Sequence, residues 1–568
     1  MTNRETMEEL MHFKDYRSGQ LTNGIERAAH RALLYSLGLD QSDFKKPMIA
    51  VVNSFTEMVP GHQHLNQIAA AVKKGISEGG GVPIEFSTIA ICDGICQGHK
   101  GMCYPLASRE LIADCIEMMV EAHQFDGMVM IPGCDKIVPG MLMAANRLDI
   151  PAIFVSGGPM LPGKYKDLDV ITLTDMREQI GRTQKGLMSA TDLMELEQQA
   201  LPGPGTCAML GTANTMGCLT EVLGMSLPGC GLALAVSSKK QRLAKQSGRR
   251  IVEMVGEQLT ARKILTRDAF LDAIAASMAL GASTNSTLHL PAIAHEAGLD
   301  ISLRDFDRLS SQVPYLCNIK PSGQYPLSVL DELGGIPVVL KSLEGRLHGD
   351  RLTVTGHSLR ENLSQVQLVE NDVVYPVSAP KDKEGGLAVL YGNLAPQGAV
   401  VKKSGVKPSM YYFEGRARIF HSMEDASYAV SHDLIHSGDV LVIRYEGPKG
   451  GPGMREMHMT TSLLVGRGMD ESCALITDGR FSGSTRGPCI GHISPEAAAG
   501  GPIAAVEEGD KIIIDIPNRR LELCLPPEEI TSRLSRLQPV VKDCTPALRR
   551  YSLLVTSADQ GAILREKL

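Results

Sequence analysis

The sequence predicts an α/β protein of two domains: an N-terminal domain with a mostly parallel sheet flanked by helices, and a C-terminal β-barrel-like domain with peripheral helices. A chain of 568 residues is too long for one hydrophobic core. Up to about residue 160, short apolar runs alternate with helical patterns, which is typical of βαβ units. Beyond about residue 335, short strands and glycine-rich turns predominate. We expect domains over residues 1–360 and 361–568, with the boundary between residues 345 and 375.

Composition narrows the possible functions. Hydrophobic residues make up 43% and charged residues 21% of the chain, as in ordinary globular proteins. The net charge of −7 provides no basic surface for a phosphate backbone, and 4% aromatic residues without tryptophan offer few rings for base stacking. We therefore expect no nucleic-acid partner. No apolar run approaches the ~20 residues of a membrane helix, so we expect no membrane partner. The polar residues 1–6 lack the apolar segment of a signal peptide, so the 13 cysteines are expected to be thiols or metal ligands in the cytoplasm.

The first domain is expected to alternate helices and strands in order. The predicted helices span residues 24–37, 63–78, 108–123 and 141–147, and the predicted strands span residues 48–52, 84–91, 128–131 and 152–155. Residues 160–200 are expected to form a polar helical excursion, and helical segments continue to about Arg308.

Chemically active side chains follow three of these strands. The apolar run 128–131 enters a Pro-Gly turn that presents Cys134, Asp135 and Lys136 in succession. Gly61-His62 and Cys92-Asp93 follow the two earlier strands. The carboxyl ends of parallel strands share one sheet edge, where ligands bind in open α/β sheets. We therefore expect a metal site here; the alternative is a reduced core cysteine beside a surface ion pair.

Cys207 lies in a glycine-rich loop, residues 202–209, that is expected to open a helix. A helix N-terminus favours a thiolate, which iron or zinc requires. The alternative is a small residue that packs in a turn.

The second domain is predicted from short strands at residues 352–354, 387–390, 440–443, 474–477 and 511–516. Two of its loops resemble binding loops. The glycine-dense loop 445–456 lacks the P-loop pattern, permits close backbone approach to a ligand and ends in Glu456, a hard oxygen donor. The loop 477–484 carries Ser482 outside any Gly-x-Ser-x-Gly elbow. Either loop alone is equally consistent with a plain turn.

Taken together, these segments resemble the family of dihydroxy-acid, 6-phosphogluconate and aldonic acid dehydratases, with the closest likeness to the dihydroxy-acid dehydratases. The resemblance covers essentially the whole chain. The matching stretches are Gly24-Ile25-Glu26-Arg27, Asn53-Ser54-Phe55-Thr56-Glu57, Cys92-Asp93-Gly94-Ile95, Ser108-Arg109-Glu110-Leu111-Ile112-Ala113-Asp114, Cys134-Asp135-Lys136, Thr212-Ala213-Asn214, residues 447–454, Asp478-Gly479-Arg480-Phe481-Ser482-Gly483 and His492-Ile493-Ser494-Pro495-Glu496-Ala497-Ala498.

The resemblance implies a cofactor set and a reaction. It implies an iron–sulfur cluster on Cys134 and Cys207, and Ser482 as an alkoxide base. It also implies a Mg²⁺ ion, whose ligands would be Asp93, Asp135, Glu456 and a carbamylated Lys136. The implied substrate is a small 2,3-dihydroxy carboxylic acid, which would lose water to give a 2-keto acid, as in branched-chain amino acid synthesis. A homodimer or a dimer of dimers is also implied.

The chain departs from the family pattern at two places. Many members carry a third cluster cysteine where this chain has Gly61, so the third ligand and the cluster type, [2Fe-2S] or [4Fe-4S], stay open. The candidates for the third ligand are Cys92, Cys96, Cys103 and His62. Residues 208–211 also depart from the usual pattern, which leaves an aldonic or other sugar acid open as substrate. Arg486 would then read a polar substrate tail, or else be a structural residue between domains. A non-catalytic iron–sulfur sensor is a third possibility, which the retained Mg²⁺ positions and Ser482 disfavour.

Overall fold

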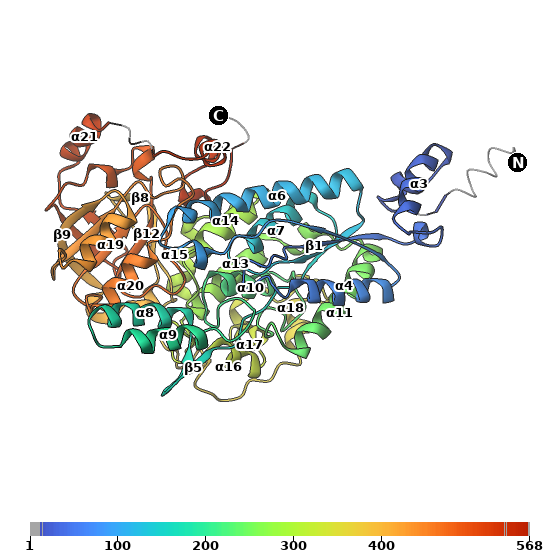
Figure 1. Cartoon of the computed structure of the whole chain (residues 1–568), viewed down its shortest axis with the longest axis horizontal. Helices are drawn as coiled ribbons and strands as arrows, with labels where there is room; N and C mark the ends of the chain where they lie inside the picture. The colour runs from blue at the N-terminus through green and yellow to red at the C-terminus, as the bar shows by residue number, and fades with distance from the viewer. Residues whose placement is uncertain (1–11, 14, 539, 541, 566–568) are drawn as a thin grey trace, which may run out of the picture.

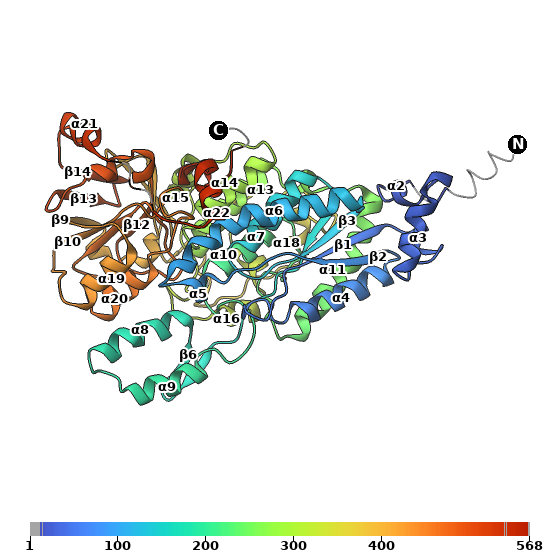
Figure 2. The same cartoon turned by 45° about the horizontal axis from the view of Figure 1, so that its top comes forward.

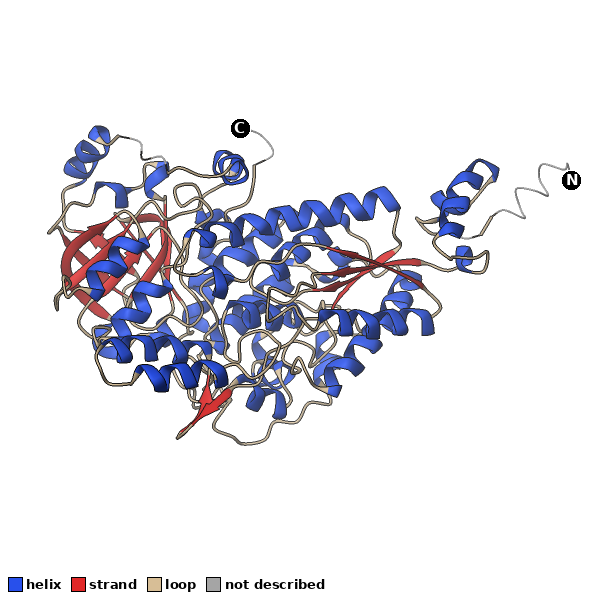
Figure 3. Ribbon diagram, in the orientation of Figure 1, coloured by secondary structure: helices blue, strands red, loops and turns tan. Residues whose placement is uncertain are grey.

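The computed structural model describes residues 12–13, 15–538, 540 and 542–565. An open sheet with its helices occupies one half of the molecule and a closed barrel the other (Figures 1 and 3). The predicted fold class is therefore confirmed. Residues 1–6, on which the expectation about a signal peptide rested, lie outside the described residues. Within the described part of the chain, no helix is both long and apolar enough to cross a membrane.

The open sheet is parallel throughout, in the order β2-β1-β3-β4. Its strands are β1 (Met48–Asn53), β2 (Val82–Ser87), β3 (Gly127–Ile131) and β4 (Ala152–Phe154). Asn53, the last residue of β1, pairs with Ser87 on one side and Ile131 on the other. Because β1, β2 and β3 end at the same level, the loops that follow them start side by side.

Two predicted strands differ from the structure. The strand predicted over residues 84–91 ends at Ser87, because β1 ends opposite it and offers no further partner. Residues 88–91 instead form a loop that leads to Cys92. The predicted strand at residues 352–354 is wrong: Leu352 makes only an isolated bridge to Ser358, and the N–H of Thr353 bonds the carbonyl of His357 across a tight turn.

Helices cover both faces of the sheet. Helices α6 and α7 lie over one face and α4 and α11 over the other (Figure 1). The α-helices of this half are α2 (Gly19–Thr22), α3 (Ala28–Ser36), α4 (Leu65–Glu78), α5 (Asp93–Cys96), α6 (Tyr104–His123), α7 (Ile137–Leu148), α10 (Thr212–Val222), α11 (Ser238–Glu257), α12 (Ala261–Ile264), α13 (Arg267–Leu280), α14 (Ser286–Glu296), α15 (Leu303–Gln312), α16 (Leu327–Glu332), α17 (Ile336–Ser342) and α18 (Leu359–Leu363).

The excursion after β4 contains a hairpin as well as the predicted helices. The hairpin is β5 (Gly163–Tyr165) and β6 (Leu168–Ile171), and the helices are α8 (Leu173–Gln184) and α9 (Ala190–Gln199). Figure 2 shows these elements as a lobe that projects beside the barrel. Helix α8 packs against α20 (His458–Gly466) of the barrel half.

In the described residues, eight strands close the barrel in the order β10-β11-β12-β8-β7-β14-β13-β9. They are β7 (Ala388–Gly392), β8 (Ala395–Val401), β9 (Tyr412–Phe420), β10 (Asp439–Ile443), β11 (Ala474–Thr477), β12 (Cys489–Ser494), β13 (Lys511–Asp515) and β14 (Arg520–Leu523). The helices of this half besides α20 are α19 (Met423–Ser431) and α21 (Pro527–Arg536), while α22 (Pro546–Leu554) packs on α6. Alternate residues of β10 serve two cores, since Val440 and Val442 fill the barrel while Leu441 and Ile443 pack outward with residues of α19 and α20.

One glycine allows the two halves to approach closely. Gly453, in the loop after β10, has φ +89°, and a Cβ placed on it would lie 1.9 Å from the carbonyl oxygen of Cys103. Only glycine fits this position. The loop 445–456 thus approaches the start of α6, and this contact brings Glu456 to the open sheet, while the predicted approach to a ligand stays a prediction.

Candidate functional site

The aligned strand ends bring the three predicted segments together. Nζ of Lys136, after β3, lies 2.8 Å from Oδ2 of Asp93, after β2. The backbone N–H of Cys134 donates to Nε2 of His62, after β1, across 2.7 Å. The predicted convergence at one sheet edge is confirmed, and it follows from strands that end at the same level.

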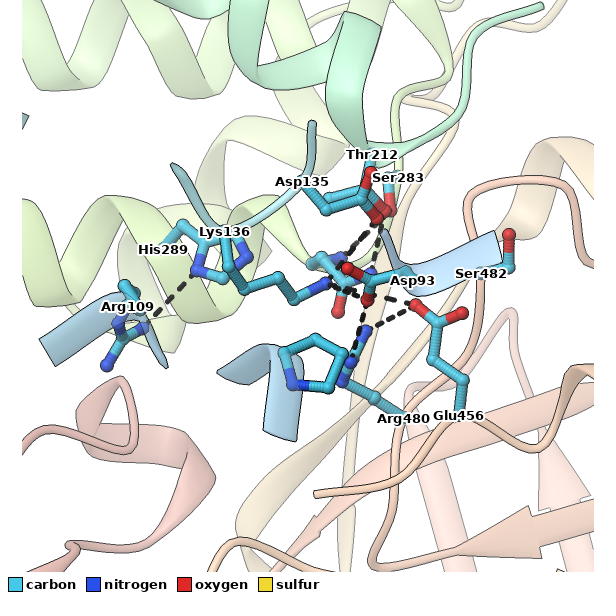
Figure 4. Close-up of polar contacts among 12 residues, drawn as sticks. Asp93, Arg109, Asp135, Lys136, Thr212, Ser283, His289, Glu456, Arg480 and Ser482 are labelled. Atoms are coloured by element: carbon cyan, nitrogen blue, oxygen red, sulfur yellow. Dashed lines mark hydrogen bonds and ion pairs between the residues drawn. The ribbon is translucent and has the colours of Figure 1, made fainter. Parts of the chain in front are cut away.

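Three carboxylates meet at this edge. Ligand atoms of Asp93, Asp135 and Glu456 all lie within 4.8 Å of one another. The fully buried Nζ of Lys136 lies among them, 2.8 Å from Asp93, 3.5 Å from Asp135 and 3.9 Å from Glu456. Figure 4 shows the lysine entering from the open sheet and Glu456 from the barrel half. The acidic group is therefore shared between the two halves of the molecule.

Arg480 is a second buried cation in this group. Its Nη2 lies 2.9 Å from Oδ2 of Asp93, and its Nη1 donates to Oε1 of Glu456 (Figure 4). Sequence analysis missed this residue, although it lies two positions before Ser482 in a motif that had been singled out. The signal was present as an arginine in the short loop directly after a predicted buried strand, where an unpaired buried charge would be costly.

The electrostatics of the three carboxylates suit a cation. Burial, followed by repulsion from Asp93, raises the pKa of Asp135 to about 7. Burial also acts to raise the pKa of Asp93, but Lys136 and Arg480 outweigh it and hold that pKa below its ordinary value. Oδ1 of Asp93 is buried and has no hydrogen-bond partner among the described residues. Hard oxygen donors of this kind can hold a divalent metal ion such as Mg²⁺.

Ser482 lies in the loop after β11, on the barrel side of the carboxylates (Figure 4). The loop is held by Lys402, whose Nζ donates to the carbonyl of Gly483 across 2.6 Å, and by Asn285, whose Nδ2 donates to the carbonyl of Phe481 across 3.0 Å. Oγ of Ser482 lies 2.9 Å from Oγ of Ser484. The serine hydroxyl is thus fixed on a loop whose flanking carbonyls are both bonded.

His458 extends the row of hydroxyl groups formed by Ser482 and Ser484. Nε2 of His458 lies 3.3 Å from Oγ of Ser484, and burial lowers the pKa of His458 well below its ordinary value. The ring is therefore a neutral imidazole in a hydrogen-bonded row that ends at Ser482. Sequence analysis did not find this row, because His458 and Ser484 are brought together only by the packing of α20 on the barrel.

The expectation about the Cys207 thiolate is wrong for the protein without a metal. Helix α10 begins at Thr212 with Gly211 as its N-cap, so Cys207 lies in the preceding loop rather than at the helix end. Burial raises the pKa of Cys207 to about 12. Desolvation thus dominates, and the thiol is neutral unless a cation binds it.

Arg486 was predicted to read a substrate tail or to act at the domain interface. Its Nη1 lies 2.9 Å from Oε1 of Glu178 on α8, so it joins the barrel to the projecting lobe. This contact favours the interface role.

Comparisons with known proteins agree on one family. A family model described as dihydroxy-acid/6-phosphogluconate dehydratase N-terminal matches residues 46–362, and the corresponding C-terminal model matches residues 372–562. A dihydroxy-acid dehydratase of Methanothermobacter thermautotrophicus is 53% identical over 550 residues, covering 97% of this chain and 100% of the relative. One of Halothermothrix orenii is 52% identical over 551 residues (96% and 100%), and one of Pyrococcus abyssi is 53% identical over 552 residues (97% and 100%).

Proposed function

This chain belongs to the dihydroxy-acid/6-phosphogluconate dehydratase family, a family of hydro-lyases, and from that premise we propose that it converts a 2,3-dihydroxy carboxylic acid to a 2-keto acid. The proposed substrates are the 2,3-dihydroxy-3-methyl acids of branched-chain amino acid synthesis. Relatives that are 52–53% identical over nearly the whole chain and are named dihydroxy-acid dehydratase support this choice.

The proposed divalent ion is Mg²⁺, held by Asp93, Asp135, Glu456 and a carbamylated Lys136. The partnerless Oδ1 of Asp93 and the buried carboxylate group support it. Carbamylation changes Lys136 from a cation to an anion, and the charge of the ion offsets this change. The site would thus keep its net charge while the lysine gains oxygen donors. When bound, Mg²⁺ supplies a Lewis acid that stabilises the negative charge developing at C2 of the substrate.

The proposed iron–sulfur cluster, [4Fe-4S] or [2Fe-2S], takes Cys134 and Cys207 as ligands. Cys134 is buried and Cys207 half-buried, and they lie on loops that flank position 61, which supports this ligand pair. An iron with an open coordination position supplies a Lewis acid for the departing 3-hydroxyl.

Ser482 is the proposed base for the C2 proton. Its loop is bonded at Phe481 and Gly483, so its Oγ is fixed in position. Arg480 neutralises part of the buried negative charge beside it. The enol formed by loss of water then tautomerises to the 2-keto acid.

The observation that carries the proposal is that Ser482, on a barrel loop, lies beside an acidic group drawn from both halves of the molecule (Figure 4). The test is anaerobic 2-keto acid formation by the reconstituted protein with 2,3-dihydroxyisovalerate and with a panel of aldonates. We expect a strong preference for the branched acid. Ser482→Ala should abolish turnover while keeping the iron content, whereas turnover by this variant at the wild-type rate would refute the assignment of the base.

The alternative proposal is an aldonic or sugar acid dehydratase that forms a 2-keto-3-deoxy acid. The departure from the family pattern at residues 208–211 supports it, since these residues directly follow Cys207 in the loop that precedes α10. The Arg486–Glu178 ion pair weakens it, because the guanidinium already has a partner. Preference for an aldonate in the same assay would favour this alternative.

We also propose that the chain works as a homodimer or a dimer of dimers. Leu33 and Leu37, on and just after α3, are 69% and 72% exposed, and Tyr35 is 50% exposed. Helix α3 stands apart from the body of the molecule (Figure 1), as a segment that packs on a second copy would. Sedimentation of the wild-type protein and of a Leu33→Glu, Leu37→Glu variant tests this, and a monomeric wild type would refute it.

The proposed domains are residues 1–360 and 361–568, with the boundary between residues 345 and 375. Helix α18 (Leu359–Leu363) contains the division at residue 360, and the first barrel strand begins at Ala388. After Leu363, the rest of the boundary region lies outside helices and strands. Limited proteolysis with cleavage confined to residues 364–387 would support the boundary.

A further inference from the structure

We propose that Cys92 is the third protein ligand of the iron–sulfur cluster and supplies the thiolate that position 61 lacks in this chain. This inference rests on the proposed function, because it names a ligand of the cluster proposed there. With Cys92, Cys134 and Cys207 bound, either cluster type retains one of its four terminal positions for substrate.

The acidic group fixes Cys92 beside Cys134. Cys92 directly precedes Asp93, and Cys134 directly precedes Asp135, whose ligand atom lies within 4.8 Å of that of Asp93. The 2.8 Å ion pair between Asp93 and Lys136 joins the same two loops. The thiols of Cys92 and Cys134 also interact with each other. The two cysteines therefore lie on neighbouring loops of the same sheet edge.

Position 61 explains why another thiol is needed. A Cβ built on Gly61 would lie 2.8 Å from Sγ of Cys134 and 3.2 Å from Cγ2 of Thr206, the residue before Cys207. This position therefore faces the space between the two cysteines proposed as ligands. Glycine offers no donor atom there. The loop that carries Cys92 reaches the same sheet edge, since Asp93, the next residue, pairs with Lys136, two positions after Cys134.

The other candidates face elsewhere or are already bonded. Both ring nitrogens of His62 are used: Nδ1 lies 2.7 Å from the carbonyl oxygen of Ser54, and Nε2 accepts the N–H of Cys134. Burial lowers the pKa of His62 to about 4, so the ring is neutral and Nδ1 carries the proton. His62 thus orients the backbone of Cys134 and has no free lone pair for iron.

Cys103 and Cys96 are directed away from the cysteine pair. Sγ of Cys103 lies 3.6 Å from the carbonyl oxygen of Gly451, in the barrel loop. Sγ of Cys96 lies 3.6 Å from the Cβ position of Gly101, in the turn that leads to α6. Cys92 precedes the short helix α5 and Cys96 is its last residue, so Cys96 is a matched control for Cys92.

The experiment compares Cys92→Ala and Cys92→Ser with Cys96→Ala and Cys103→Ala. Each protein is purified and reconstituted without oxygen, its iron and acid-labile sulfide are measured per chain, and the reduced cluster is examined by electron paramagnetic resonance. Circular dichroism of the cluster-free proteins checks that each variant is folded. Cys92→Ser nearly keeps the size of the side chain in case the alanine variant does not fold.

We expect Cys96→Ala and Cys103→Ala to match the wild type in iron, sulfide and spectrum. Cys92→Ala should lose most of its iron and sulfide, and Cys92→Ser should lose them or show a shifted spectrum, because a serine oxygen would replace a thiolate. Wild-type content and spectrum in a folded Cys92 variant would overturn the inference, as would loss confined to Cys96→Ala or Cys103→Ala. A wild-type protein that takes up no cluster would instead contradict the proposed cofactor.

Discussion

Nη2 of Arg480 lies 2.9 Å from Oδ2 of Asp93, and both side chains are buried, so this pair joins the barrel half to the open sheet inside the candidate site. Each partner also contacts another charge, since Arg480 donates to Glu456 and Asp93 pairs with Lys136. Such a network holds the two halves in register at the point where chemistry is proposed.

Replacing Arg480 by Met should destabilise the protein strongly. Removing one partner of a buried ion pair leaves an uncompensated charge and costs about 3–5 kcal/mol. We expect the free energy of unfolding of the metal-free protein, measured with urea, to fall by that amount. Arg486→Met is the matched control, because its ion pair with Glu178 is partly exposed and is worth at most about 1 kcal/mol. Equal losses in the two variants would contradict this account.

Bicarbonate should tighten Mg²⁺ binding to the wild-type protein. The ammonium of Lys136 lies among the three carboxylates and competes with a cation, whereas a carbamate would add oxygen donors. We expect about tenfold tighter binding, or ~1.4 kcal/mol, in calorimetric titration with added bicarbonate. Lys136→Met should show no bicarbonate effect, while Lys403→Met, which changes a buried lysine paired with Asp382 and Glu384, should keep it. An effect of equal size in Lys136→Met would exclude the carbamate.

The sequence predicted the parts of the site whose positions follow from the order of strands and helices along the chain. The meeting of Asp93 with Lys136 follows from strands that end level at Asn53, and alternation of strands and helices is enough to predict it. The Cys207 dipole argument failed because it needed the first residue of a helix, which sequence patterns locate poorly.

Arg480 and His458 could not be predicted by the same reasoning. Their partners, Asp93 and Ser484, are set by how the barrel docks on the sheet and how α20 packs on the barrel. These contacts join residues that are far apart in the sequence, and no periodic pattern of residues predicts them. The length of the strand at residues 84–91 was likewise decided by its partner β1 rather than by its own apolar residues.

His458 should promote the proposed base function of Ser482. With the proton on Nε2, the ring donates to Ser484, which in turn donates to Ser482 across 2.9 Å and favours its alkoxide. His458→Leu should therefore raise the pKa of Ser482 and move the ascending limb of the kcat–pH profile to higher pH. We expect kcat near neutral pH to fall about tenfold to a hundredfold, the value of a hydrogen bond to a charged group.

Two further variants separate this effect from a packing defect. His458→Gln retains an N–H donor and should restore part of the wild-type profile. Ser462→Ala removes a hydroxyl 3.4 Å from Nε2 of His458 that lies outside the row to Ser482, and it should leave the profile unchanged. An unshifted limb in His458→Leu would show that the row does not act on the base.

Lys402 should make stability depend on pH. Burial, followed by repulsion from Arg486, lowers the pKa of Lys402 from its ordinary value of 10.5 to about 7. Between these values the unfolded chain binds a proton that the folded chain does not, so stability rises with pH over this window. We expect the melting temperature of the wild type, relative to Lys402→Met, to be constant below pH 7 and to increase from pH 7 to pH 10. Arg486 keeps its charge over this range, so Arg486→Met should raise the pKa of Lys402 and start the increase at higher pH. A difference between wild type and Lys402→Met that is constant from pH 6 to pH 10 would mean that the buried amine does not titrate in this window.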